Sequence, residues 1–107
     1  MNATQRSATM KRWRGVIIEL VYDGHRKQES RMDALVLWGL MRDLGHDVSQ
    51  HDVLTLCQDL KKMGFLDFQQ ERVSLNNEVR VSQIELTGDG LLLAEQEKQH
   101  PLVRILL

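Results

Sequence analysis

The spacing of apolar residues changes at Gly64, and this change limits the folds that the chain can adopt. Before Gly64, apolar residues recur three and four positions apart in three stretches, which predicts helices. After Gly64 they form two short, largely alternating runs, which predicts strands. The helical stretches contain Trp13, Val16, Ile17, Leu20 and Val21, then Leu35, Leu37, Trp38, Met41 and Leu44, then Val53, Leu56, Cys57, Leu60 and Met63; the strands contain Leu66, Phe68, Val73 and Leu75, then Val79, Val81, Ile84 and Leu86.

Capping residues set the expected limits of four helices. Ser49, followed by Asp52 in a short capping box, opens the third helix, and Gly45 and Gly64 end the second and third. The expected helices are 10–23, capped by Thr9 and ended by Asp23-Gly24; 32–44, opened by Ser30 or Arg31 after a polar loop over 25–30; 50–63; and 89–98, broken by Pro101.

The chain has 107 residues, the size of one domain. We expect a flexible polar arm over residues 1–9, a domain over residues 10–98 and an apolar tail over residues 99–107. The fold class expected is mostly α with a small β-hairpin, in the order helix-helix-helix-strand-strand-helix. The side chains expected to be buried are Trp13, Ile17, Leu35, Trp38, Val53, Leu56, Leu60, Phe68, Ile84 and Leu86.

Two registers of the hairpin can be compared from the sequence. A two-residue loop at Asn76-Asn77 would set Phe68 opposite Glu85 and separate it from Ile84. A three-residue loop that also includes Glu78 keeps Leu66, Phe68, Ile84 and Leu86 on one face, where they can cover the helices, and we prefer it. Its pairs are Phe68 with Leu86, Gln70 with Ile84, Val73 with Val81, Ser82 with Arg72 and Ser74 with Arg80.

The order of elements is that of a winged helix-turn-helix, and two local patterns resemble this family. They are Val53-x-x-Leu56-x-x-x-Leu60-x-x-x-Gly64-Phe65-Leu66 and Ile84-x-Leu86-Thr87-x-x-Gly90-x-x-Leu93-Ala94. Together with Arg14-x-x-Ile17 and the run Leu44-Gly45-His46-Asp47-Val48-Ser49, they are similar to small winged-helix proteins of Mu-like bacteriophages and prophages. The resemblance covers most of the chain and implies a DNA-binding fold with the third helix in the major groove.

The outward face of the third helix carries side chains suited to DNA. Gln can bind adenine, Thr can meet a thymine methyl group and Lys can neutralise phosphate. Asp52, Asp59 and the apolar Leu54 count against tight binding, and an ordinary surface helix is the alternative. The candidate contacts are Gln50, His51, Thr55, Gln58, Lys61 and Lys62.

Two further groups of basic residues are candidates for contacts with the DNA backbone. In the preferred register, Arg72 and Arg80 share one face of the wing, although each can instead pair with a nearby glutamate. The start of the first helix carries a cluster made of Arg6, Lys11, Arg12 and Arg14, of which the last three are the expected backbone contacts. A solvated basic arm is the alternative for this cluster.

Other function classes find no support in the sequence. The net charge of −1 requires any DNA contact to be local. The four His residues have no nucleophile or ligand at a recognisable spacing, so we expect no catalysis, metal, cofactor or small-molecule substrate. Cys57 lies on an apolar stripe and is expected to be buried. Because no signal peptide or membrane span is evident, the expected location is the cytoplasm.

We therefore expect a DNA-binding regulator, and a protein-interaction adaptor on the same scaffold is the alternative. Homodimerisation is also expected, since the wing residues Val73, Leu75, Val79 and Val81 and the tail residues Leu102, Val103, Ile105, Leu106 and Leu107 would otherwise be exposed. The tail can instead fold back over Val16 or Leu20 of its own chain, which would leave a monomer.

Overall fold

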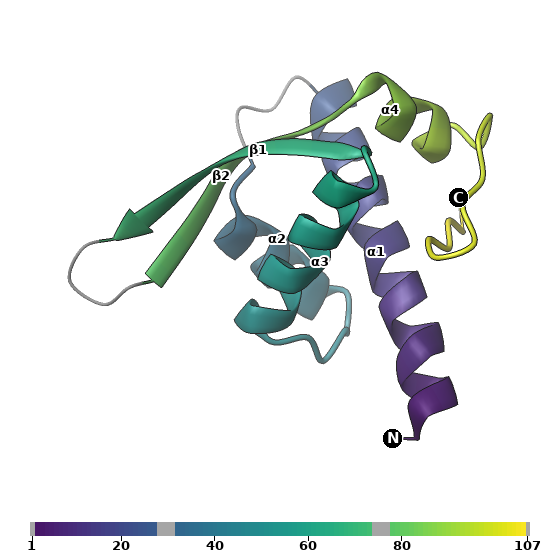
Figure 1. Ribbon diagram of the computed structural model, residues 1–107, viewed down its shortest axis with the longest axis horizontal. Helices are drawn as coiled ribbons and strands as arrows, with labels where there is room; N and C mark the ends of the chain where they lie inside the picture. Colours follow the sequence, from purple (N-terminus) through teal and green to yellow (C-terminus); the bar gives the residue numbers. More distant parts are fainter. Residues whose placement is uncertain (1, 28–31, 74–77, 107) are drawn as a thin grey trace.

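The computed structural model describes residues 2–27, 32–73 and 78–106. Its elements, drawn in Figure 1, follow the predicted order: α1 (Ala3–Arg26), α2 (Ala34–Asp43), α3 (Gln50–Lys62), β1 (Leu66–Val73), β2 (Glu78–Leu86) and α4 (Gly88–Ala94). The hairpin extends away from the helices on one side, and α4 and the C-terminal tail lie on the other. The mixed α and β class with a two-stranded antiparallel hairpin is confirmed.

The first helix begins seven residues earlier than expected, so residues 3–9 belong to α1 rather than to a separate arm. Asn2 accepts a hydrogen bond from the Gln5 backbone N–H at 2.8 Å, and the Gln5 side chain accepts one from the Asn2 N–H at 3.1 Å. This reciprocal capping box stabilises a start that has no apolar pattern. Thr9, expected to be the cap, donates its hydroxyl to the Gln5 carbonyl inside the helix. The helix also continues past Asp23-Gly24 to Arg26.

The limits of the next two helices were predicted more accurately, because capping residues and glycines mark them in the sequence. The capping box of α3 is confirmed, with Ser49 and Asp52 exchanging side-chain and backbone hydrogen bonds. Gly45 and Gly64 have positive φ values of 91° and 88°, the conformation that favours glycine after a helix end. Asp33, rather than Ser30 or Arg31, caps α2; both of those residues lie outside the described ranges.

The core combines α1, α2, α3 and the base of the hairpin. Of the ten side chains expected to be buried, Trp38 and Leu86 are half-buried and Leu35 is 59% exposed. Leu37 and Met41 point into the core in its place, and both are fully buried. The error arose because α2 is apolar on every side, so its sequence does not identify the inner face. Seven residues are confirmed as buried: Trp13, Ile17, Val53, Leu56, Leu60, Phe68 and Ile84.

The predicted register of the hairpin is wrong. The strands pair with Leu66 opposite Leu86 at the base and with Val73 opposite Glu78 near the tip. Glu78 is therefore a strand residue and not part of the turn, whereas Asn76 and Asn77 lie outside the described residues. The observed partners nearer the tip are Gln69 with Ser82, Gln70 with Val81, Glu71 with Arg80 and Arg72 with Val79.

A β-bulge accounts for this difference. Gln83 has a φ of 53°, and the register shifts between Asp67 and Gln69, where β2 contains one residue more than β1. An extra residue reverses the alternation of side chains beyond it. Val81 and Ile84 are therefore both buried, although they are three positions apart. The bulged segment is also held from outside the hairpin, since the Ile84 N–H donates to the Met32 carbonyl at 2.9 Å.

The C-terminal tail folds back over α1, which was one of the two alternatives expected. The helix α4 ends at Ala94, before Pro101, and the chain then returns to α1. The Arg104 N–H donates to the Lys11 carbonyl at 3.0 Å, and the Leu106 N–H donates to a Glu19 carboxylate oxygen at 2.8 Å. Val103 is 8% exposed, so the tail contributes to the core.

Cys57 is buried within α3, as expected. Burial raises the pKa of its thiol from 9.0 to about 12, because the thiolate would lose its hydration. We expect an aromatic disulfide reagent at pH 8 to react with Cys57 only when the protein unfolds, since the thiolate is the nucleophile. The reaction rate should rise with urea in parallel with unfolding measured by circular dichroism. Rapid labelling of the folded chain would contradict this placement.

Within the described residues, no helix is long and apolar enough to cross a membrane.

Candidate nucleic-acid interface

The start of α3 is fixed relative to α2 by the short connector between them. The Trp38 indole Nε1 donates to the Val48 carbonyl at 2.8 Å, which ties α2 to the residue before the cap. Val48 and Val53 are 1% and 0% exposed and occupy the two positions of a hydrophobic staple around Ser49. The direction in which α3 leaves the connector is therefore set by packing and by hydrogen bonds.

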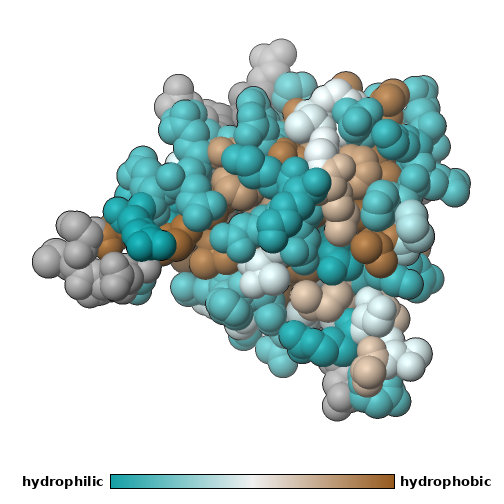
Figure 2. Space-filling view, viewed as in Figure 1, coloured by the Kyte–Doolittle hydropathy of each residue, from teal (hydrophilic) through white to brown (hydrophobic). Residues whose placement is uncertain are grey.

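One face of α3 points away from the core and is polar. His51, Thr55, Gln58 and Lys62 follow one another at spacings of four, three and four residues, which align them along one side of a helix. His51 and Lys62 are exposed, and Thr55 and Gln58 are half-buried. Figure 2 shows hydrophilic side chains over most of the face on which α3 lies. These side chains supply hydrogen-bond donors and acceptors together with one positive charge.

The acidic residues of α3, Asp52 and Asp59, flank this polar face and are engaged within the chain. Asp52 accepts a hydrogen bond from the Ser49 N–H at 3.3 Å as part of the cap. Asp59 forms an ion pair with Arg14 of α1, with 3.4 Å between Oδ2 and Nη2. The negative charges that counted against DNA binding are thus engaged in capping and in helix packing. Leu54, the third objection, is half-buried and packs against the core.

Lys61 is directed toward the hairpin. Its ammonium lies 4.6 Å from the centre of the Phe68 ring and 3.3 Å from the Phe68 carbonyl oxygen. It also approaches the Asp67 carboxylate at 3.5 Å. Lys61 therefore connects α3 to β1, and Lys62 is the more available of the two lysines for an external anion. Gln50, the remaining candidate on α3, is exposed in the first turn.

The two arginines of the hairpin lie on opposite faces, contrary to the prediction. Arg80 is directly opposite Glu71, and Arg72 is directly opposite Val79. Residues that are directly opposite share a face, whereas successive residues of a strand alternate, so Arg72 and Arg80 diverge. Both are exposed, and neither forms an ion pair with another side chain in the described part of the chain. The two arginines could therefore contact the same partner only if that partner reached both faces of the hairpin.

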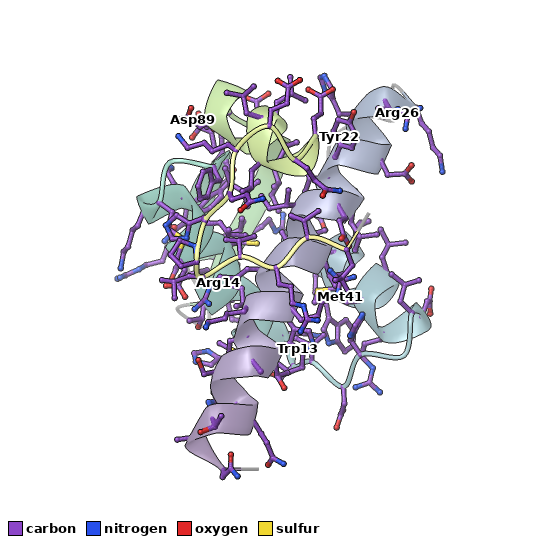
Figure 3. All side chains as sticks on the ribbon, turned by 90° about the vertical axis from the view of Figure 1, so that its right-hand side faces the viewer. Trp13, Arg14, Tyr22, Arg26, Met41 and Asp89 are labelled. Atoms are coloured by element: carbon purple, nitrogen blue, oxygen red, sulfur yellow. The ribbon has the colours of Figure 1, made fainter. Side chains whose placement is uncertain are left out.

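The basic cluster of α1 holds the C-terminal tail. Arg12 makes two hydrogen bonds of 3.0 Å with the Glu19 carboxylate and donates to the Arg104 carbonyl at 3.0 Å. Arg14 donates to the Leu102 carbonyl at 3.1 Å in addition to its ion pair with Asp59. Figure 3 shows the tail crossing α1 close to Arg14.

Of the predicted backbone contacts, Arg12 and Arg14 are thus largely occupied within the chain. Lys11 is half-buried and accepts the Arg104 N–H with its carbonyl. These roles were not predictable from local patterns, because the groups that engage the two arginines lie up to 92 positions away along the chain.

Lys62 of α3 is exposed, as are Arg72 and Arg80 on the two faces of the hairpin. The described residues contain no group of three or more His, Cys, Asp or Glu side chains able to hold a metal ion. The arrangement is therefore a polar helix face flanked by cations on a projecting hairpin.

No protein-family model matches the chain, and no curated protein matches its sequence.

Proposed function

We propose that the protein is a winged helix-turn-helix DNA-binding protein, with α3 in the major groove and the hairpin as a wing beside the phosphate backbone. The observation that carries the proposal is the polar face of α3, whose flanking residues Asp52 and Asp59 are engaged within the chain. A helix of this kind can enter the major groove and read base edges with amide and hydroxyl groups. In the setting suggested by the resemblance to phage proteins, the role would be that of a transcriptional regulator.

The roles proposed for the individual side chains follow from their chemistry. Gln58 and Thr55 lie in the middle of the α3 face and would contact bases. Lys62, Arg72 and Arg80 would neutralise phosphates, with the two arginines on either side of the wing. His51 and Gln50, at the start of α3, would meet the groove first. Arg12 and Arg14 are omitted because they hold the tail.

Replacing Lys62, Arg72 and Arg80 together with alanine should weaken binding to all duplex sequences. Each lost phosphate contact should reduce the slope of log affinity against log salt by about 0.9, so the triple change should reduce it by up to about 2.7. Fluorescence anisotropy at several salt concentrations measures both effects. Lys98→Ala is the control, because it also removes one positive charge but lies outside the proposed surface. Lys98 follows α4 and pairs with Asp89 in the first turn of that helix. Equal slopes for the wild-type and triple variants would contradict the proposed phosphate contacts.

Replacing Gln58 with alanine should change the sequence preference and leave the salt slope unchanged. A lost base contact should cost about 1–3 kcal/mol at one base pair and nothing at the others. Selection from a pool of random duplexes, compared between the wild-type and variant proteins, measures this. A uniform loss across all sequences would show that Gln58 does not read a base.

A protein-interaction adaptor is the second candidate, and one observation favours it. Leu35 and Val36 on the outer side of α2 are 59% and 47% exposed, which is unusual for neighbouring apolar residues of one helix. If the wild-type chain shows no affinity for duplex DNA at low salt, the adaptor becomes the better interpretation of the fold.

A further inference from the structure

The C-terminal tail is docked on α1 mainly through its backbone. The Arg104 N–H donates to the Lys11 carbonyl at 3.0 Å, and the Leu106 N–H donates to the Glu19 carboxylate at 2.8 Å. Within the described part of the tail, Val103 alone has a buried side chain. The tail therefore buries little apolar surface, and its position depends on individual hydrogen bonds.

A turn made of His100, Pro101, Leu102 and Val103 brings the tail back to α1. The Val103 N–H donates to the His100 carbonyl at 3.2 Å, which closes a β-turn with proline at its second position. The imidazole Nδ1 of His100 accepts the Leu102 N–H at 3.1 Å. Asparagine and aspartate side chains stabilise turns in the same way, by accepting the N–H two residues further on. The imidazole also makes an edge-to-face contact with the Phe65 ring, with the two ring centroids 5.4 Å apart.

We propose that His100 is a pH-sensitive switch for the tail, in which the neutral imidazole holds the turn and protonation releases the tail from α1. Nδ1 can accept the Leu102 N–H only through a free lone pair, and both ring nitrogens of an imidazolium carry a proton. Protonation would therefore replace the acceptor with a donor that faces another donor. Histidine is the side chain whose charge normally changes between pH 5 and 8. His100 is half-buried, so solvent can reach it.

The charged groups around the turn offer a positive imidazole no partner. Among the described residues, no carboxylate oxygen forms an ion pair with the His100 ring. Arg104 adds a second positive charge on the tail itself. The neighbouring elements carry charged groups that pair with one another: Arg14 of α1 with Asp59 of α3, Lys61 of α3 with Asp67 of β1, and Lys98 with Asp89 of α4.

Release of the tail would change the surface of α1. The guanidinium groups of Arg12 and Arg14 would lose their hydrogen bonds to the tail carbonyls of Arg104 and Leu102. Val103 would also be uncovered. This inference does not depend on DNA binding, and its test contains no DNA.

Hydrogen exchange of the full chain at pH 7.5 and pH 5.5 tests the switch. After correction for the intrinsic exchange rate at each pH, the protection factors of the Arg104 and Leu106 amides should fall at least about threefold at the lower pH, the effect of losing one hydrogen bond. Amides in α3 should keep their protection, which separates release of the tail from general unfolding.

His100→Asn should keep the tail docked and remove the pH dependence, because the asparagine oxygen can accept the same N–H and does not titrate. His100→Ala should lower the protection of the tail amides at both pH values. His25→Asn is the matched control and should behave like the wild-type protein. His25 is exposed in the last turn of α1, whereas the hydrogen bonds of the tail to α1 end at Glu19.

Equal protection of the tail amides at the two pH values in the wild-type protein would overturn the proposal. So would a pH dependence that persists in His100→Asn, because another group would then be titrating. Equal losses of protection in His100→Asn and His100→Ala at pH 7.5 would also overturn it, because the contact of the ring with Phe65, and not the hydrogen bond, would then position the tail.

Discussion

Gly90→Ala should lower the free energy of unfolding by about 3 kcal/mol, the upper end of the usual cost of overpacking. A Cβ at this position would lie 2.0 Å from the Phe65 carbonyl oxygen, well inside van der Waals contact. That oxygen belongs to the backbone and accepts the Thr87 N–H at 3.1 Å. The Thr87 hydroxyl caps α4 and is also bonded to the Gly64 carbonyl. The added Cβ would therefore clash with backbone atoms of Phe65, which cannot move aside as the end of a flexible side chain could.

Urea unfolding followed by circular dichroism measures this effect. Gly88→Ala is the matched control, because it lies in the same turn of α4 and its Cβ would meet nothing within 4 Å. The control should cost little or nothing. If both variants unfold at the urea concentration of the wild-type protein, α4 does not pack against Phe65 as described.

Gly15→Ala should detach the C-terminal tail and destabilise the protein by about 1–3 kcal/mol. A Cβ on Gly15 would lie 1.7 Å from the Arg104 carbonyl oxygen, so α1 and the tail cannot both keep their positions. The tail should yield, because α1 is held by the core along its other side. Its departure would break the hydrogen bonds of Arg104 with Lys11 and Arg12 and would uncover Val103.

Hydrogen exchange separates tail release from general unfolding. In Gly15→Ala, the amides of Arg104 and Leu106 should exchange much faster than in the wild-type protein, while amides in α3 remain protected. Gly39→Ala serves as the control, since it adds the same methyl group to a helix where nothing is within 4 Å. Unchanged protection at Arg104 would contradict the close approach of the tail to Gly15.

The parts of the fold that were predicted correctly are those decided by neighbours in the sequence. The capping box of Ser49 and Asp52 needs only four consecutive residues, and the turns at Gly45 and Gly64 need only a residue that adopts positive φ. The order of elements followed from the change in apolar spacing. The outward face of α3 was predictable for the same reason.

The errors arose where distant parts of the chain decide the outcome. The bulge at Gln83 is held by a hydrogen bond between Ile84 and Met32, which no alternation rule includes. Because the predicted register contained no bulge, it placed Arg72 and Arg80 on the same face of the hairpin. The bonds of Arg12 and Arg14 to the tail, which bear on their predicted contacts with DNA, were not foreseen because the tail is distant in sequence. The inner face of α2 was misplaced because both of its sides are apolar.

We propose that α3 and the hairpin form a DNA-binding surface. Amide chemical-shift mapping of the labelled full chain during titration with duplex DNA tests it most directly. We expect the largest shifts in α3, between His51 and Lys62, and in the hairpin around Arg72 and Arg80. Shifts concentrated on α2 or on the tail beside Arg104, or no shifts at low salt, would contradict it.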